Sequence, residues 1–502
     1  MASPRRSLVV LSFLLAVNFV FAQSSADEFK SRHRTEFEKF RTEKRQEFKV
    51  FRDSVNALYG RQMRAPWKEI KAEPEKPVPP SPEPPTPIVA DPDEEPSNDP
   101  LPFKSVSPLP KPLPHPVPLL PNRETPKPQL TKREIPSIPT PVSTPLFSFD
   151  FYGTSCEVPF NPHLKFSFRN IDENAVADAW DTLSSDESIP LVESLVGIRN
   201  NLGLSDWSYL KLVEKFANEV YHSNNNESKV LQMFLLTQSG YKVRIGRMAE
   251  NIVLLVPSDN TIYNRMYLVL DGTTYYVTER VKVGGIKVFN NEFPREQSFS
   301  LNFSQQPSLA FKNGGSRHIR SKHNAAIDMD VEVNHNLIDL YNEYPLLSGQ
   351  WNMYASASLS TEVKKQLYPI LLREIEGKSE QNAANILLHF VQTAFQYKTD
   401  DEQFGYERSF FPDETFFYPY SDCEDRAILY SVLVRDLLGL DVVLVHYPGH
   451  LATAVRFSEP VRGDYFNIDG NTFTVCDPTY INSNVGMAMP RYRNSDAEII
   501  KL

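Results

Sequence analysis

The sequence is poor in cysteine, in basic residues and in long apolar runs, and each shortage excludes a class of protein. Only 3 of the 502 residues are cysteine, too few for a disulfide-stapled scaffold. Lys and Arg number 53 against 63 Asp and Glu, which gives a net charge of −10. A nucleic-acid partner is therefore not expected, because phosphate binding needs a clustered basic face. Beyond the N-terminus, no apolar run reaches the roughly 20 residues of a membrane-spanning helix.

Residues 1–22 have the pattern of a secretory signal peptide. Two arginines precede an apolar run, Leu8–Phe21, and small residues near Ala22 offer a cleavage point. We therefore expect an exported chain, periplasmic or extracellular, with an uncleaved anchor as the alternative. An oxidising compartment would permit a disulfide between Cys156 and Cys476, although both can equally be buried thiols.

Prolines are concentrated in one stretch and divide the chain. About 25 of the 41 lie between Pro74 and Pro145. Proline removes backbone donors and favours extended chain, so residues 74–145 are predicted to be a disordered linker. The remaining folded part, about 355 residues, is long enough for two domains, which we assign to residues 146–345 and 346–502.

A charged helical segment, residues 23–73, precedes the linker. Within residues 27–60, aromatic residues recur every eleven positions in two rows. Eleven residues make three helical turns, so each row lies on one side of a helix. Such rows suit a helical or cell-envelope partner, whereas a single helix that packs loosely or not at all is the plainer alternative. The rows are Phe29, Phe40, Phe51 and Phe37, Phe48, Tyr59.

Cys423 stands where a nucleophile is expected. Ser421 and Glu424 form the pattern of a helix-starting capping box, and Gly439 is a plausible helix end. A cysteine in the first helical turn meets the positive end of the helix dipole, which favours thiolate. Neighbouring carboxylates, including Asp422 and Asp425, would raise the thiol pKa unless they turn away.

His450 and Asp477 complete a nucleophile–base–orienter set. His450 opens a predicted strand after a tight turn, and Asp477 ends a later strand. If the two strands are neighbours, the carboxylate can hold the imidazole while its other nitrogen faces Cys423. His446 competes as the base, although it reads as a core histidine. A metal site from Cys423, His446, His450 and Cys476 lacks recognised ligand spacing, so neither metal nor cofactor is predicted.

Three motifs in this order resemble the transglutaminase-like superfamily over about residues 360–480. They are Asp422–Arg426, Gly449–Val455 and Cys476–Tyr480. The resemblance implies an α+β fold with a papain-like core, in which Cys423 attacks a protein or peptide substrate, His450 is the base and Asp477 the orienter. It also suggests Gln392, or else Gln396, as a possible oxyanion helper.

The function implied is an exported cysteine hydrolase, a peptidase or amidase working through an acyl-enzyme. A transglutaminase that cross-links glutamine side chains would use the same intermediate. A non-enzymatic binding or scaffold protein of the cell envelope also stays open, because the linker and the aromatic helix suit that role.

An internal repeat indicates that residues 146–345 are a degenerate copy of the same unit. Tyr267–Thr274 echoes Tyr465–Thr472. Equal spacing from the preceding helix end puts Asn251 in the place of His450 and Glu279 near that of Asp477, with the Cys423 position among Asn224–Asn226. Chance similarity between two helix–strand–strand segments is the alternative.

Overall fold

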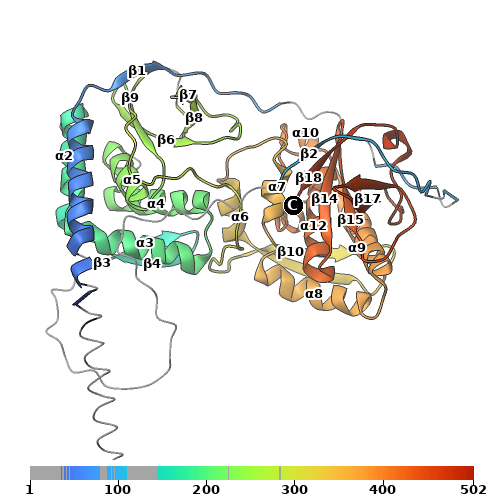
Figure 1. The fold of residues 1–502 in the computed structure, drawn as a ribbon. Coiled ribbons are helices and arrows are strands. Elements are labelled where there is room, and N and C mark those ends of the chain that lie inside the picture. Colours follow the sequence, from blue (N-terminus) through green and yellow to red (C-terminus); the bar gives the residue numbers. More distant parts are fainter. Residues whose placement is uncertain are drawn as a thin grey trace, which may run out of the picture.

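The computed structural model describes residues 36–79, 87–109 and 144–502, except for residues 37–38, 41, 45, 92, 95, 224 and 282–283. The predicted signal peptide, Phe29 and Phe37 lie outside the described residues. Within the described part of the chain, no helix is long and apolar enough to cross a membrane. The fold is α+β, as expected, with helices and two six-stranded sheets in two units side by side (Figure 1).

The first unit has a six-stranded sheet in the order β1-β9-β5-β6-β8-β7. Its strands are β1 (Lys68–Lys71), β5 (Arg244–Met248), β6 (Asn251–Pro257), β7 (Tyr267–Leu270), β8 (Thr273–Val277) and β9 (Gly285–Phe289). Four helices accompany it: α2 (Glu173–Leu183), α3 (Ile189–Leu202), α4 (Asp206–Tyr221) and α5 (Asn226–Gln238). Nearly every side chain of α5 is buried, so this helix forms the centre of the unit.

Hairpins and short helices flank and connect the units. The first hairpin is β3 (Leu146–Phe151) with β4 (Thr154–Pro159), and the second is β10 (Asn313–Arg320) with β11 (Asp328–Asn334). The short helices are η1 (Pro162–Leu164), η2 (Asp186–Ser188), α6 (His335–Asn342) and α7 (Trp351–Ser356).

The second unit has a sheet in the order β16-β17-β15-β14-β18-β2. Its strands are β2 (Phe103–Ser107), β14 (Asp441–Tyr447), β15 (His450–Arg456), β16 (Tyr465–Ile468), β17 (Asn471–Cys476) and β18 (Ala497–Lys501). Its helices are α8 (Thr361–Ile375), α9 (Glu380–Ala394), α10 (Asp400–Phe404), α11 (Glu414–Phe417), α12 (Cys423–Leu438) and η3 (Pro490–Tyr492). A short parallel pair, β12 (Gln396–Tyr397) and β13 (Tyr420–Ser421), lies just before α12.

The two six-stranded sheets correspond strand by strand. Reading β7, β8, β6, β5, β9, β1 against β16, β17, β15, β14, β18, β2 gives the same order in each. Helices α5 and α12 each end one or two residues before a glycine of positive φ, and each leads into the fourth strand of its series. Both β7–β8 and β16–β17 turn through an Asp-Gly pair with positive φ at each residue, the geometry of a tight hairpin turn.

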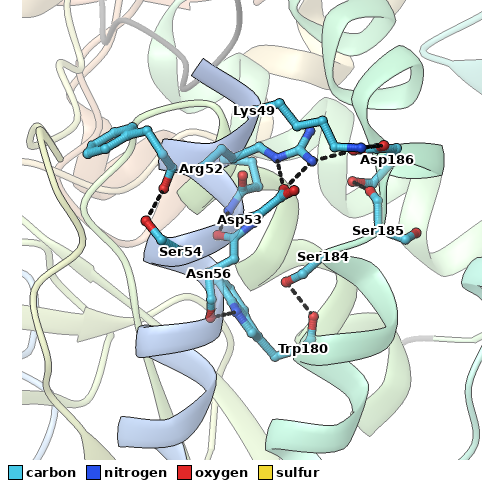
Figure 2. A network of polar contacts seen from close by, with 12 residues as sticks. Lys49, Arg52, Asp53, Ser54, Asn56, Trp180, Ser184, Ser185 and Asp186 are labelled. Carbon is cyan, nitrogen blue, oxygen red and sulfur yellow. Dashed lines mark hydrogen bonds and ion pairs between the residues drawn. The ribbon is translucent and has the colours of Figure 1, made fainter. Parts of the chain in front are cut away.

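The N-terminal helix packs on the first unit through one of its two aromatic rows. Residues 46–63 are helical. Tyr59 is buried and packs against Trp180 of α2 with ring centroids 4.8 Å apart, and Phe48 is half-buried. Polar contacts fix the same face, including Trp180 Nε1 donating to the Asn56 carbonyl at 3.1 Å (Figure 2). Phe40 and Phe51, of the other row, are exposed.

Part of the proline-rich stretch is packed, which corrects the prediction of a disordered linker over residues 74–145. Strand β2 pairs in parallel with β18, and Val89 and Pro100 bridge to Ile481 and Tyr465. An extended chain that lacks some donors can still pair at a sheet edge, where only one side of the strand is bonded. The described residues of the segment 87–107 therefore belong to the second unit.

Candidate functional site

Helix α12 places Cys423 at its first position. The preceding Asp422 is the N-cap and forms a reciprocal capping box with Asp425, whose Oδ2 accepts from the Asp422 N–H at 3.2 Å. The predicted box of Ser421 and Glu424 is wrong by one residue, because Ser421 is taken up by β13. The predicted end at Gly439 is confirmed, with φ at 67°.

His450 and Asp477 meet because β15 and β17 are neighbours. His450 is the first residue of β15, and Asp477 directly follows β17. The Nε2 atom of His450 lies 2.8 Å from Oδ2 of Asp477. The other oxygen, Oδ1, accepts from the backbone N–H groups of Thr479 and Tyr480 at 2.9 and 3.2 Å. The carboxylate is therefore fixed by its own loop and in turn fixes the imidazole.

Cys423 contacts the start of the same strand. The backbone N–H of Leu451, the residue after His450, lies near the Cys423 sulfur and counteracts part of the rise in the pKa of its thiol. The Nδ1 atom of His450 is buried and has no hydrogen-bond partner among the described residues. Because Nε2 is held by Asp477, Nδ1 is the nitrogen left to act as a base. No hydrogen bond joins the thiol and the imidazole in the described part of the chain.

The three residues are closed off from solvent. Cys423 is 3% exposed, and His450 and Asp477 are each 2% exposed. The ring of Tyr492, from η3, lies parallel to the His450 imidazole with centroids 5.0 Å apart, and it also stacks on Tyr447 at 4.8 Å. A substrate carbonyl therefore cannot reach the sulfur until this cover moves.

Buried carboxylates surround the thiol. Burial raises the pKa of Asp422 and Asp425 well above the usual range, and it raises that of Glu424 to about 7. The Cys423 thiol lies 3.1 Å from Oε2 of Glu424 and donates to it. Burial, Glu424 and Asp422 together raise the pKa of Cys423 well above its usual value. The carboxylates do not turn away, so they oppose ionisation of the Cys423 thiol.

The same carboxylates form the only kind of potential metal-ligand group found in the described residues. Three groups of side chains have ligand atoms within 4.8 Å of one another, and they draw on Asp400, Glu407, Asp422, Cys423, Glu424 and Asp425. None includes His446, His450 or Cys476. The metal site considered above, of Cys423, His446, His450 and Cys476, is therefore not formed. The carboxylates instead make an oxygen-rich group of the type that hard cations prefer.

Gln392 holds the loop that carries Asp477. Its Nε2 donates to the carbonyls of Asp477, Tyr480 and Ser483 at 2.8 to 3.1 Å, and its Oε1 accepts from Asn482 N–H at 3.1 Å. Both ends of the Gln392 amide are therefore bonded to the loop of residues 477–483 rather than directed at Cys423, which differs from the expected oxyanion role.

The other competing residues lie apart from the site. Gln396 is exposed. His446 is half-buried against Trp351 and 3.5 Å from Glu498. Burial lowers its pKa. Cys156 and Cys476 are free, buried thiols rather than a disulfide.

The first unit has amides where the second has a thiol and an imidazole. Asn226 is the first residue of α5, and its Oδ1 accepts from the Ile252 N–H at 2.7 Å, while the Cys423 sulfur lies near the N–H of Leu451. Asn251 opens β6 as His450 opens β15. Val256 pairs with Tyr276 in the first unit as Val455 pairs with Thr474 in the second. Glu279 lies three residues after Tyr276 and Asp477 three residues after Thr474, so Glu279 occupies the position that corresponds to Asp477. Glu279 is 3.1 Å from Lys229 Nζ.

Sequence reasoning missed Tyr492, Asp400 and Glu407. None lies in a motif or beside a predicted strand end, and they reach the site only through the folding of two long loops. The aromatic and acidic composition of the loop before α12 was the only available signal. No protein-family profile, curated protein or solved structure matches this chain.

Proposed function

We propose that the chain is an exported cysteine hydrolase of the transglutaminase-like type, acting as a peptidase or amidase. The observation that carries the proposal is the His450–Asp477 pair, with Nδ1 of His450 unpaired and the next residue, Leu451, close to Cys423. The base and orienter contact of a nucleophile–base–orienter set is thus present, and the nearby thiol supports a role for Cys423 as the nucleophile.

Each residue has a defined role in the proposed reaction. The thiol of Cys423 transfers its proton to Nδ1 of His450, and the thiolate attacks the amide carbonyl. Backbone N–H groups in the first turn of α12 that are not used by the capping box stabilise the oxyanion. His450 then gives the proton to the leaving amine, and water, deprotonated by His450, hydrolyses the thioester. Asp477 keeps Nε2 protonated and the ring oriented throughout.

The proposed reaction requires an open state. In the closed state Tyr492 covers His450, and Glu424 opposes ionisation of the thiol. Substrate binding would displace Tyr492 and separate Cys423 from Glu424, so that the imidazole becomes its acceptor. The closed state would protect the thiol from oxidation in an exported protein.

We further propose that the two units are a duplication on a papain-like core, with the first copy disarmed. The same strand order, the same hairpin register and the matched contacts of Asn226 and Cys423 support it. Asn226 and Asn251 can supply neither a nucleophile nor a base, so the chemistry would belong to the second copy alone.

The test is hydrolysis of a dye-quenched protein substrate by the full chain. Cys423→Ala and His450→Gln should each lower the rate by about a thousandfold or more, while Cys156→Ala, a buried free thiol of the first unit, should leave it unchanged. Hydrolysis that survives Cys423→Ala would refute the mechanism. Incorporation of a fluorescent amine into a glutamine-rich protein, rather than cleavage, would identify a cross-linking transglutaminase instead.

A binding or scaffold protein is the second candidate. The buried thiol with its raised pKa favours it, as does the exposed row of Phe40 and Phe51, which could contact a helical or envelope partner. Under this proposal no amide substrate is cleaved or labelled, and Cys423 reacts with an amide-mimicking electrophile no faster than Cys156 does.

A further inference from the structure

A cavity of about 300 Å³ lies where the two units meet. From the first unit it is lined by Lys211, Arg265 and Arg280, and from the second by Tyr406 and Arg408. Tyrosines of the connecting segment complete the wall. A volume of this size is within the range of small-molecule sites, which often lie between domains.

Two of the four cations in this wall are neutralised by the protein itself. Lys211 Nζ is 2.7 Å from Glu214 and 3.0 Å from Glu343. Arg408 pairs with the buried Glu414 and also donates to Asn342 at 2.8 Å. These pairs build the wall but leave no charge for a ligand.

The other two cations, Arg265 and Arg280, face the cavity without a partner. Among the residues that the structure describes, no direct hydrogen bond or ion pair is seen at either guanidinium. The carboxylates of Glu214, Glu279 and Glu75 act on Arg265 from a greater distance, and Arg280 is exposed to solvent. Burial, and next the charge of Arg280, lower the pKa of Arg265. Two like charges facing one cavity repel each other, and an anion between them removes that cost.

The cavity adjoins the first unit's counterpart of the proposed catalytic site. Glu279, which corresponds to Asp477, directly precedes Arg280 and is held by Lys229. Its carboxylate also acts on Arg265 and offsets part of the lowering of the Arg265 pKa. In this unit Asn226 and Asn251 stand in the places of Cys423 and His450, and Arg280 brings a guanidinium group into the chain segment that follows Glu279.

We propose that this cavity binds a small anionic ligand, whose carboxylate or phosphate group is held between Arg265 and Arg280. Guanidinium groups recognise both oxyanions through paired N–H donors. The tyrosine rings of the wall would pack against the rest of the ligand, and the cavity size limits it to a small molecule or a side chain. The inference does not rest on catalysis by Cys423.

Calorimetric titration of the full chain tests the site, with inorganic phosphate and glutarate as probes and uncharged glutaramide as the matched control. Phosphate, glutarate or both should bind at low ionic strength, more weakly as salt is added, while glutaramide should not. Arg265→Gln and Arg280→Gln should each weaken binding about tenfold or more, because each removes a charged hydrogen-bonding group. Arg61→Gln, at an exposed position of the N-terminal helix, should leave it unchanged.

The arms of the experiment distinguish the ligand types. Binding of phosphate alone would identify a phosphorylated ligand, and binding of glutarate alone a carboxylate ligand. Binding of neither anion, equal binding of glutaramide, or anion binding unaltered in Arg265→Gln and Arg280→Gln variants with native circular dichroism would overturn the proposal.

Discussion

The ring of Tyr492 lies parallel to the imidazole of His450, with centroids 5.0 Å apart and an interplanar angle of 10°. Tyr492 is carried by the short helix η3, whose loop is tied to the N-terminal segment 87–107. Glu94 accepts from the hydroxyl of Tyr480 and pairs with Arg493 at 3.0 Å. The cover over the candidate site is therefore held from outside by a segment almost 400 residues earlier in the chain.

Tyr492→Ala should open the site. Removing the ring exposes Cys423 and His450 more often, so alkylation of Cys423 by iodoacetamide should be about tenfold faster. Mass spectrometry of the Cys423 peptide measures the rate, and Tyr406→Ala, at an exposed tyrosine, is the control. An unchanged rate in a folded Tyr492→Ala variant would show that Tyr492 is not the cover.

Glu424→Gln should make the thiol more acidic. Glu424 is the largest charged contributor to the raised pKa of Cys423, and glutamine keeps its shape without the charge. The pH profile of Cys423 alkylation should therefore shift to lower pH. The control Glu402→Gln, at an exposed position of helix α10, should not shift the pH profile. If Cys423 alkylation had the same pH profile in Glu424→Gln, in Glu402→Gln and in the parent, the charge of Glu424 would not control the acidity of the thiol.

Gln392→Leu should destabilise the loop that carries Asp477. It leaves three buried carbonyls and one N–H without their partner, at a cost of about 1–3 kcal/mol in the free energy of unfolding. Gln396→Leu, four residues later and exposed, should cost within about 0.5 kcal/mol. Urea denaturation measures both. Equal stability of the two variants would mean that the Gln392 contacts do not hold the loop.

Asp413→Asn should flatten the dependence of stability on pH. Burial raises the pKa of Asp413 to about 7, from an unfolded value near 4. The folded state thus binds the proton more tightly, so this group's contribution is present below about pH 4 and is lost as pH rises through 7. Between these two pH values, Asp413 lowers the free energy of unfolding by at most about 1.4 kcal/mol for each unit of rising pH.

Asparagine is a close replacement because its oxygen can still accept from the Ser360 N–H, which lies 2.9 Å from Asp413 Oδ2. Asp401→Asn, at an exposed position, is the control and should keep the parent slope. Urea denaturation at pH 4, 5.5, 7 and 8 gives the comparison. A slope that is the same in Asp413→Asn and in the parent would rule out a raised pKa at Asp413.

Local pattern was enough to place most elements of the second unit. The strand predicted to open at His450 is β15, and the strand predicted to end at Asp477 is β17, which ends one residue earlier. Gly439 ends α12, and His450 meets Asp477, because alternation, turn glycines and register are short-range properties of the chain. The N-cap was misplaced by one residue because Ser421 joins a strand pair, a contact that no local pattern reveals.

The sequence by itself determined the α+β class, the helix that bears Cys423 and the strand ends that bring His450 and Asp477 together. Only the tertiary structure decided that Tyr492 covers the imidazole, that Gln392 ties down a loop and that residues 87–107 join a sheet edge. It also placed Arg265 and Arg280 in one cavity between the units. These contacts join residues far apart in the chain, and their partners are set by how the units pack rather than by any repeating pattern along the sequence.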